Sequence, residues 1–180
     1  MRRALGVMCA LACLPGASAF AQSAPAVDVA VLGAYVRDSQ PMNMKGVVVS
    51  AAKRLSGPVS IVGEVGRHSG TSEVTLLLFP SRTITLEDTE LGVSGGLRFG
   101  GGSGAEVRTF AQILTGWNRR TFNGANPAHT WQLQPELGLD VNMTEAVALR
   151  LQLGWRYLMT TSSYRNEFRL ATGVAFKIGG

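Results

Sequence analysis

The chain has 180 residues, of which 46% are hydrophobic, 16% charged and 7% aromatic. This composition fits one folded domain and excludes an intrinsically disordered chain. The longest apolar run, residues 4–14, is shorter than the roughly 20 residues that a transmembrane helix needs. The formal charge of +5 says little about partners, because two of the basic residues lie among the first three positions.

The N-terminus has the pattern of an export signal. Arg2 and Arg3 precede the apolar run, and Ala19-Phe20-Ala21, an A-x-A cleavage pattern, follows it. This order predicts a signal peptide, residues 1–21, cleaved to leave a single domain, residues 22–180. The remaining 15 basic residues are scattered among 12 acidic ones, which argues against a nucleic-acid partner.

The predicted mature domain offers little to a cofactor. Both cysteines, Cys9 and Cys13, fall within the predicted signal peptide. We therefore expect no disulfide, no thiol nucleophile and no thiolate metal site, and two lone histidines make no metal motif. The glycine run 100–104 lacks the residues of a phosphate-binding loop. We predict neither a metal nor a cofactor.

Eight segments alternate apolar and polar or small residues with a period of two, which predicts β-strands. They cover residues 27–36, 46–55, 59–66, 90–99, 106–117, 131–142, 146–157 and 168–178. Short turns are expected at 56–58, 100–104 and 142–145, and longer loops at 38–45, 68–88, 118–130 and 159–165. Short turns at one end and long loops at the other predict an all-β, closed, eight-stranded antiparallel up-and-down transmembrane β-barrel.

The two faces of these strands decide which face meets lipid. One face is bulky and apolar, whereas the other combines Gly and Ala with Arg, Glu, Asp and Gln. Small residues and ion pairs suit the narrow lumen of an eight-stranded barrel, and the apolar face then meets lipid. A soluble periplasmic ligand-binding barrel, with its apolar face inside, stays open as an alternative.

Aromatic residues on the apolar face gather at two levels. Two bands of such side chains are typical of the two interfaces of a bilayer, whereas core aromatics of a soluble protein would be spread more evenly. At the long-loop end lie Tyr35, Trp117, Trp131, Trp155 and Tyr157, and at the short-turn end Phe99 and Phe176.

These features resemble the small outer-membrane barrels of the OmpA-transmembrane, opacity-protein and Ail type. The resemblance is most specific over residues 138–151 and 166–178. It implies a monomer in the bacterial outer membrane, surrounded by lipid and lipopolysaccharide and inserted by the barrel assembly machinery. Many such barrels end in a phenylalanine, whereas Phe176 here precedes the end by four residues.

Charged residues on the polar face predict an ion-pair network in the lumen, because buried charges require partners. The expected pairs are Arg98 with Glu106, Glu136 with Arg150, and Asp28 with Lys177. The network would plug the lumen or, as an alternative, gate a narrow ion pore. Its members are Asp28, Glu64, Arg98, Glu106, Arg108, Glu136, Asp140, Arg150, Arg156, Arg169 and Lys177.

An enzyme is the alternative of a different class, because some barrels of this size modify lipid A. His68-Ser69 and His129-Thr130 lie at the expected outer interface, but adjacent strand residues point to opposite faces and make no dyad alone. We expect no enzymatic activity.

The second long loop is unusually apolar for a segment beyond the membrane. We predict a projecting hairpin here, with a bulge, and a binding surface for a host or other surface partner by strand addition. The function predicted is therefore structural or adhesive. The candidate contact residues are Val74, Leu76, Leu77, Leu78 and Phe79.

Overall fold

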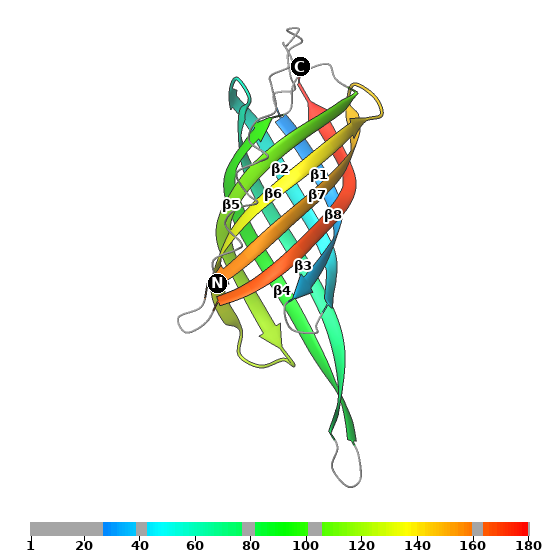
Figure 1. The fold of residues 1–180 in the computed structure, drawn as a ribbon, viewed down its shortest axis with the longest axis vertical. Helices are drawn as coiled ribbons and strands as arrows, with labels where there is room; N and C mark the ends of the chain where they lie inside the picture. Colours follow the sequence, from blue (N-terminus) through cyan, green and yellow to red (C-terminus); the bar gives the residue numbers. More distant parts are fainter. Residues whose placement is uncertain (1–26, 39–42, 77–81, 101–105, 160–163, 180) are drawn as a thin grey trace, which may run out of the picture.

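The computed structural model describes residues 27–38, 43–76, 82–100, 106–159 and 164–179, which form a closed antiparallel barrel (Figure 1). Each strand pairs with its neighbours in chain order, and β1 pairs with β8. The predicted fold class is confirmed; the predicted signal peptide lies outside the described residues. The strands are β1 (Val27–Asp38), β2 (Asn43–Ser56), β3 (Val59–Leu76), β4 (Arg82–Gly100), β5 (Val107–Phe122), β6 (Ala128–Asn142), β7 (Val147–Met159) and β8 (Tyr164–Ile178).

The register fixes how the strands tilt. A row of paired residues that starts at Val27 on β1 returns to β1 at Arg37, ten positions nearer the long loops. Strands in a closed barrel must tilt to accommodate such a stagger. The intermediate members of the row are, in strand order, Lys53, Ile61, Leu97, Ile113, Pro135, Trp155 (by continuation of the β6–β7 register) and Phe168.

The barrel is inside-out relative to a soluble one. Arg150, Arg156 and Arg169 are among its most deeply buried side chains, whereas Trp131 and Ile113 are more than half exposed on the outside. Such an exterior fits hydrocarbon, where a closed sheet satisfies every backbone group internally. The described residues contain no helix that is long and apolar enough to cross a membrane.

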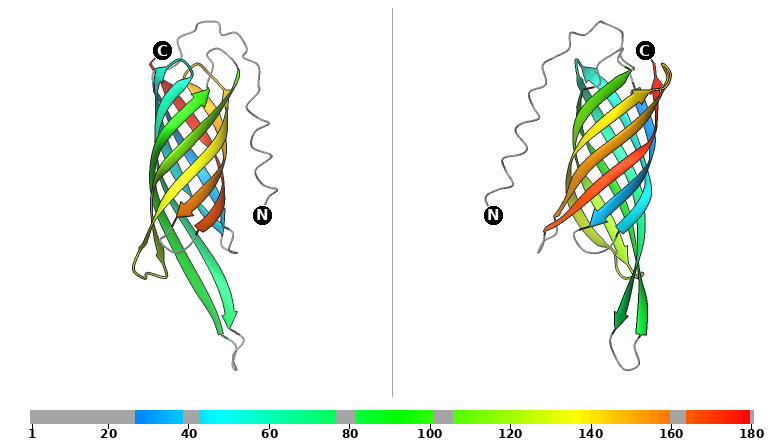
Figure 2. Two further views of the ribbon diagram at one scale, coloured as in Figure 1. Left: turned by 60° about the vertical axis from the view of Figure 1, so that its left-hand side comes forward. Right: turned by 45° about the vertical axis from the view of Figure 1, so that its right-hand side comes forward.

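Strands β3 and β4 extend far beyond the rest of the barrel at the long-loop end, which we call the mouth (Figures 1 and 2). Their pairing runs without a bulge from Val59 and Phe99 to Leu76 and Arg82. Pairing with β2 stops at Ser69, and pairing with β5 stops at Asp88. Residues 70–76 and 82–87 therefore form a two-stranded ribbon that projects from the mouth.

The predicted hairpin is thus present, but the predicted bulge is wrong. Ile84 and Leu86 lie on the same face of β4 as the lumen residues Asp88 and Glu90, because the register is continuous. The change in sequence pattern reflects a strand that leaves the barrel, where the lumen-facing side no longer needs polar residues.

Candidate functional site

The lumen contains charged side chains at three levels. The level nearest the short turns, which we call the floor, is centred on Asp28. Its carboxylate accepts hydrogen bonds from Arg98 Nη1 at 2.9 Å and from Arg150 Nη1 at 3.0 Å. Arg150 also binds Asp140 with two bonds, from Nε at 2.7 Å and from Nη2 at 2.8 Å. Arg108 lies 3.7 Å from the same Asp140 carboxylate, so both acids of the floor are shared between arginines.

An aromatic ring contacts the two central arginines of the floor. The guanidinium carbons of Arg98 and Arg150 lie 4.4 Å and 5.0 Å from the ring centroid of Phe110. The ring fits because residue 138, on the neighbouring strand, is glycine: a Cβ there would lie 2.0 Å from Phe110 Cζ. The floor is therefore held by cation–π contacts as well as ion pairs.

The middle level is a single arginine between two glutamates. Arg169 binds both carboxylate oxygens of Glu64 and donates from Nε to Glu136 Oε1 at 2.9 Å. Gln112 Nε2 donates to the other oxygen of Glu136 at 2.5 Å, and Gln112 itself accepts from Arg98 Nε at 2.8 Å. This chain of bonds links the middle of the lumen to the floor.

The third level, at the mouth, holds a larger set of charges. Arg156 contacts Glu90, and its Nη1 lies 3.2 Å from Glu167 Oε2. Arg120 contacts Asp88 and lies 3.4 Å from Glu167 and 3.8 Å from Asp38. The side chains of Asp38, Asp88, Glu90 and Glu167 are almost completely buried, and Arg165 contributes a further contact to Asp38.

Two of the expected pairs are replaced by others because the turns are centred later than expected. In the β4–β5 pairing Gly100 is opposite Phe110 and Arg98 is opposite Gln112, and Glu106 precedes β5 and is exposed. Glu106 therefore lies outside the lumen, and Arg98 binds Asp28 instead.

The pairing between β6 and β7 shows the same shift. Asp140 is opposite Arg150, whereas Glu136 is opposite Gly154. Arg150 therefore binds Asp140, and Glu136 binds Arg169. A glycine or polar run marks a turn, but it does not fix the central residue.

The third expected pair is correct in register but not in contact. Asp28 is opposite Lys177 in the β1–β8 pairing, and this pairing closes the barrel. Lys177 Nζ donates to Asn142 Oδ1, whereas Asp28 is bound by two arginines. A bidentate guanidinium fits a carboxylate better than an ammonium does.

The acids of the mouth are absent from the predicted network. Asp38 and Asp88 fall in predicted loops, although both continue the alternation of the lumen face. Glu90 and Glu167 also lie on that face and are not among the predicted members. Parity is the signal that identifies them: Asp88, Glu90 and Arg98 all occupy even-numbered positions of β4, and all three are buried.

The two histidines lie in unlike places. His68 is buried in the lumen with Nδ1 3.8 Å from Glu90 Oε1, and Ser69 faces the exterior. His129 is exposed and stacks on Trp117, with ring centroids 4.7 Å apart. No group of three His, Cys, Asp or Glu residues in the described ranges could hold a metal ion.

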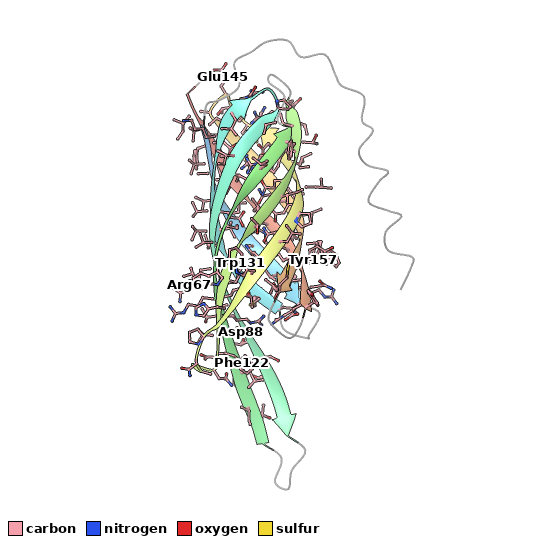
Figure 3. All side chains as sticks on the ribbon, turned by 90° about the vertical axis from the view of Figure 1, so that its left-hand side faces the viewer. Arg67, Asp88, Phe122, Trp131, Glu145 and Tyr157 are labelled. Carbon is pink, nitrogen blue, oxygen red and sulfur yellow. The ribbon has the colours of Figure 1, made fainter. Side chains whose placement is uncertain are left out.

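The aromatic residues predicted at the interfaces all face outward. Trp131 and Tyr157 lie at a similar height, near the mouth, on the outside of the barrel (Figure 3). Trp155 packs edge-on against Phe168, with centroids 5.8 Å apart. Tyr35 and Trp117 belong to the same end, and Phe99 and Phe176 lie near the floor.

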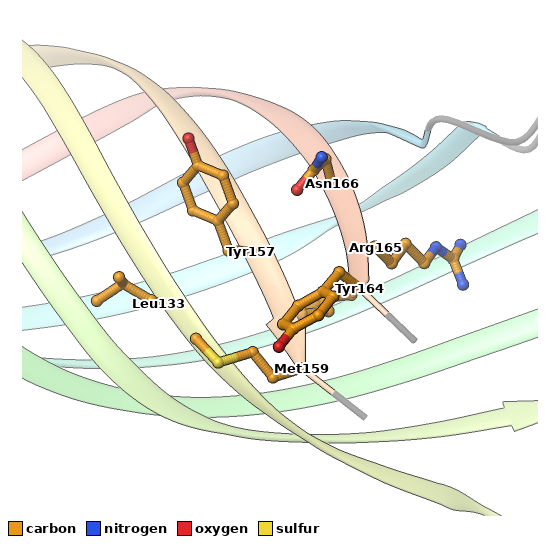
Figure 4. Close-up of a pocket in the computed structure, with 7 residues that line it drawn as sticks. Leu133, Tyr157, Met159, Tyr164, Arg165 and Asn166 are labelled. Carbon is orange, nitrogen blue, oxygen red and sulfur yellow. The ribbon is translucent and has the colours of Figure 1, made fainter. Parts of the chain in front are cut away.

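A pocket of about 430 Å³ opens between the mouth ends of β6, β7 and β8 (Figure 4). Leu133, Tyr157 and Met159 form its apolar wall, with Tyr164, Arg165 and Asn166 on the other side. It contains neither histidine, so the pocket and the histidines do not combine into one catalytic site.

The predicted contact residues at the hairpin tip are only partly placed. Val74 and Leu76 belong to β3. Leu77, Leu78 and Phe79 lie outside the described residues.

Comparison with known proteins supports the fold. No family model and no curated protein sequence matches the chain. Neisserial surface protein A (NspA) is similar in structure, with a TM-score of 0.61 at 15% identity over 87% of this chain and all of that one. OprG from Pseudomonas aeruginosa matches with a TM-score of 0.58 at 10% identity, over 88% of this chain and 98% of that one. Ail of Yersinia pestis, in complex with the heparin analogue sucrose octasulfate, matches with a TM-score of 0.50 at 13% identity, over 83% and 96%. The chain thus has the fold of small outer-membrane β-barrels, as the sequence resemblance predicted.

Proposed function

We propose that this chain, an eight-stranded barrel of the outer-membrane type, acts by surface contact through the ribbon of β3 and β4. The observation that carries the proposal is the open ribbon: residues 71–76 pair with residues 82–87, and in the described part of the chain neither segment is paired with β2 or β5. Unpaired strand edges offer rows of backbone donors and acceptors to an extended segment of a partner.

The base of the ribbon is anchored. Asn123, in the β5–β6 turn, donates its backbone N–H to the Glu87 carbonyl at 2.8 Å and accepts from the Glu87 N–H with its side chain at 2.7 Å. Asn123 adopts a φ of 47°, which asparagine tolerates better than most residues. The ribbon is therefore held at its root and open along its edges, which suits presentation of a binding strand.

We infer that the lumen is a plug and not a pore. Each of the three levels has a buried arginine bound to carboxylates: Arg150, Arg169 and Arg156. The apolar side chains of Leu32, Val48 and Leu114, from β1, β2 and β5, are also buried in the lumen. A planar-bilayer recording of the wild-type barrel should show no ion steps. Regular steps at neutral pH would favour the pore alternative.

The other two alternatives receive less support. Trp131, Ile113 and Leu137 are each more than half exposed on the outside of the barrel. A soluble ligand-binding barrel would therefore expose these large apolar side chains to water, which is unfavourable. A lipid A-modifying enzyme would need a histidine beside a nucleophile, yet His68 faces the lumen and His129 stacks on Trp117. We propose a monomer, exported with a cleaved signal peptide, residues 1–21, and inserted by the barrel assembly machinery into a lipopolysaccharide-containing membrane.

Edge-blocking substitutions test the proposal without removing the ribbon. Thr71→Lys with Thr85→Lys places charges on exposed ribbon positions, which hinders strand addition. Cells that display the variant should adhere to matrix-coated surfaces at the level of cells without the protein. Glu145→Lys, at a short turn at the opposite end, is the matched control and should adhere as wild type does (Figure 3). Adhesion unchanged by the double variant would overturn the adhesive role.

A further inference from the structure

The exterior of the barrel carries few charged residues, and three of its cations lie on adjacent strands. Arg37 on β1, Lys45 on β2 and Arg67 on β3 all face outward and are exposed. We call these three residues the cationic diagonal. Lysine and arginine on a lipid-facing surface are unfavourable at the bilayer midplane and become tolerable near the headgroups.

The register places the cationic diagonal almost level around the barrel. Arg37 is opposite Asn43, two positions from Lys45, and Lys45 is opposite Ser69, two positions from Arg67. A row of paired residues rises ten positions towards the mouth in one circuit of eight strands, which is slightly more than one position per strand. Each step of the diagonal moves two positions towards the floor, so it nearly cancels this rise. Arg67 accordingly lies at the height of Trp131 and Tyr157 (Figure 3).

Two different chemistries thus share the mouth-end belt. Strands β5 to β7 carry four of the five belt aromatics, Trp117, Trp131, Trp155 and Tyr157. Strands β1 to β3 carry the three cations and one aromatic residue, Tyr35, which is opposite Lys45. The only other exterior cation among the described residues at this end is Arg119, separated from Arg67 by Leu91. Aromatic residues suit a neutral interface, and grouped cations suit an anionic one.

The three cations are close enough to repel one another, so a nearby negative charge would stabilise them. Diagonal neighbours on adjacent strands are within reach of long side chains, and like charges that close repel each other. No salt bridge of the described residues includes any of the three. The exposed acids of the described residues lie in the ribbon or at the short turns, namely Glu73, Glu87, Glu106 and Glu145.

We propose that the cationic diagonal binds the phosphate groups of a phosphorylated glycolipid of the lipid A type in the leaflet around the mouth. Arginine and lysine both bind phosphate, and the apolar side chains below them, Val47 and Val65, would contact its acyl chains. This inference rests on the proposed membrane orientation, with the mouth in the outer leaflet, but not on the adhesive role of the ribbon.

The test uses the full barrel in phosphatidylcholine nanodiscs that contain lipid A with both phosphates or lipid A without them. Native mass spectrometry counts the lipid A that stays bound. Wild type should retain phosphorylated lipid A and not the phosphate-free form. Neutralising Arg37, Lys45 and Arg67 to Gln together should weaken retention by about fivefold per cation, on the order of a hundredfold in all.

Lys53→Gln is the matched control, because Lys53 also faces outward on β2 but lies at the floor end. It should retain lipid A as wild type does, and each variant should show the heat-dependent gel shift of a folded barrel. Equal retention by the triple variant, or of phosphate-free lipid A, would overturn the proposal. Displacement by millimolar inorganic phosphate would also overturn it, in favour of a free-anion site. A barrel with Thr71→Lys and Thr85→Lys should retain lipid A whether or not it adheres, which separates the two proposals.

Discussion

Strands β3 and β4 belong to both the barrel wall and the ribbon, but their side chains follow opposite rules in the two regions. Within the barrel, β3 and β4 contribute Glu64, Glu90 and Arg98 to a buried network in which each charge has a partner. Beyond Ser69 and Asp88 the same strands lose their outer neighbours and become an open ribbon. Closure of the sheet therefore decides which part supplies stability and which part is free to recognise a partner.

The largest effect is expected where one cation serves two buried acids. Arg169→Ala leaves Glu64 and Glu136 buried without their arginine, which should cost about 3–5 kcal/mol of unfolding free energy. Urea unfolding of the barrel in lipid vesicles measures the loss. Arg169→Leu with Glu64→Gln and Glu136→Gln should be more stable than Arg169→Ala alone. If the single variant is the more stable one, the middle level is not held by these ion pairs.

A second, smaller effect tests the packing of the floor. Gly138→Ala places a methyl group against the Phe110 ring and should destabilise the barrel by about 1–3 kcal/mol, because a filled core resists added volume. Phe110→Leu in the same chain should restore part of the loss. Gly63→Ala is the control, since a Cβ there meets nothing within 4 Å. Equal stability of the two glycine variants would show that the ring is not confined.

Substitution of Glu106, the acid that lies outside the lumen, should leave the unfolding free energy almost unchanged. Glu106→Ala should change the unfolding free energy by less than about 0.5 kcal/mol, because Glu106 is exposed. Asp28→Ala, which removes the shared partner of Arg98 and Arg150, should be clearly destabilising in the same assay. Comparable losses would restore the pairing of Arg98 with Glu106.

The smallest effect on stability should come from the ribbon itself. Shortening it by removal of residues 71–86 should leave the heat-dependent gel shift and the urea midpoint unchanged, because the barrel closes without these residues. A large loss of stability would mean that the ribbon is part of the folded core and not a separate binding element.

Period-two alternation was sufficient to predict the strands, their number and the lipid-facing side. Phe168, Val174 and Phe176 alternate with Arg169, Gly173 and Lys177 in the sequence as they do in β8. Alternation tells which face a residue occupies, but not which residue on a neighbouring strand it meets. That depends on where each turn is centred, which is why Arg98 was assigned to Glu106 and not to Asp28.

The acids of the mouth show a second limit. The sequence places Asp88 and Asp38 in predicted loops, because charged and polar runs are typical of loops, yet both bind Arg120 in the lumen. In a barrel whose lumen is polar, charged and polar runs are also typical of a strand that continues towards the mouth. Composition cannot separate the two, whereas the pairing of β4 with β5 as far as Phe122 does.

The most direct test of the account combines closure, orientation and the independence of the ribbon. A site-specific protease sequence replaces residues 77–81, and intact cells are treated with the protease before the protein is run on SDS gels with and without heating. We predict cleavage on intact cells, a nicked protein that still migrates as a single folded barrel when unheated, and two fragments after heating. No cleavage until the cells are opened, or fragments that separate without heating, would contradict the account.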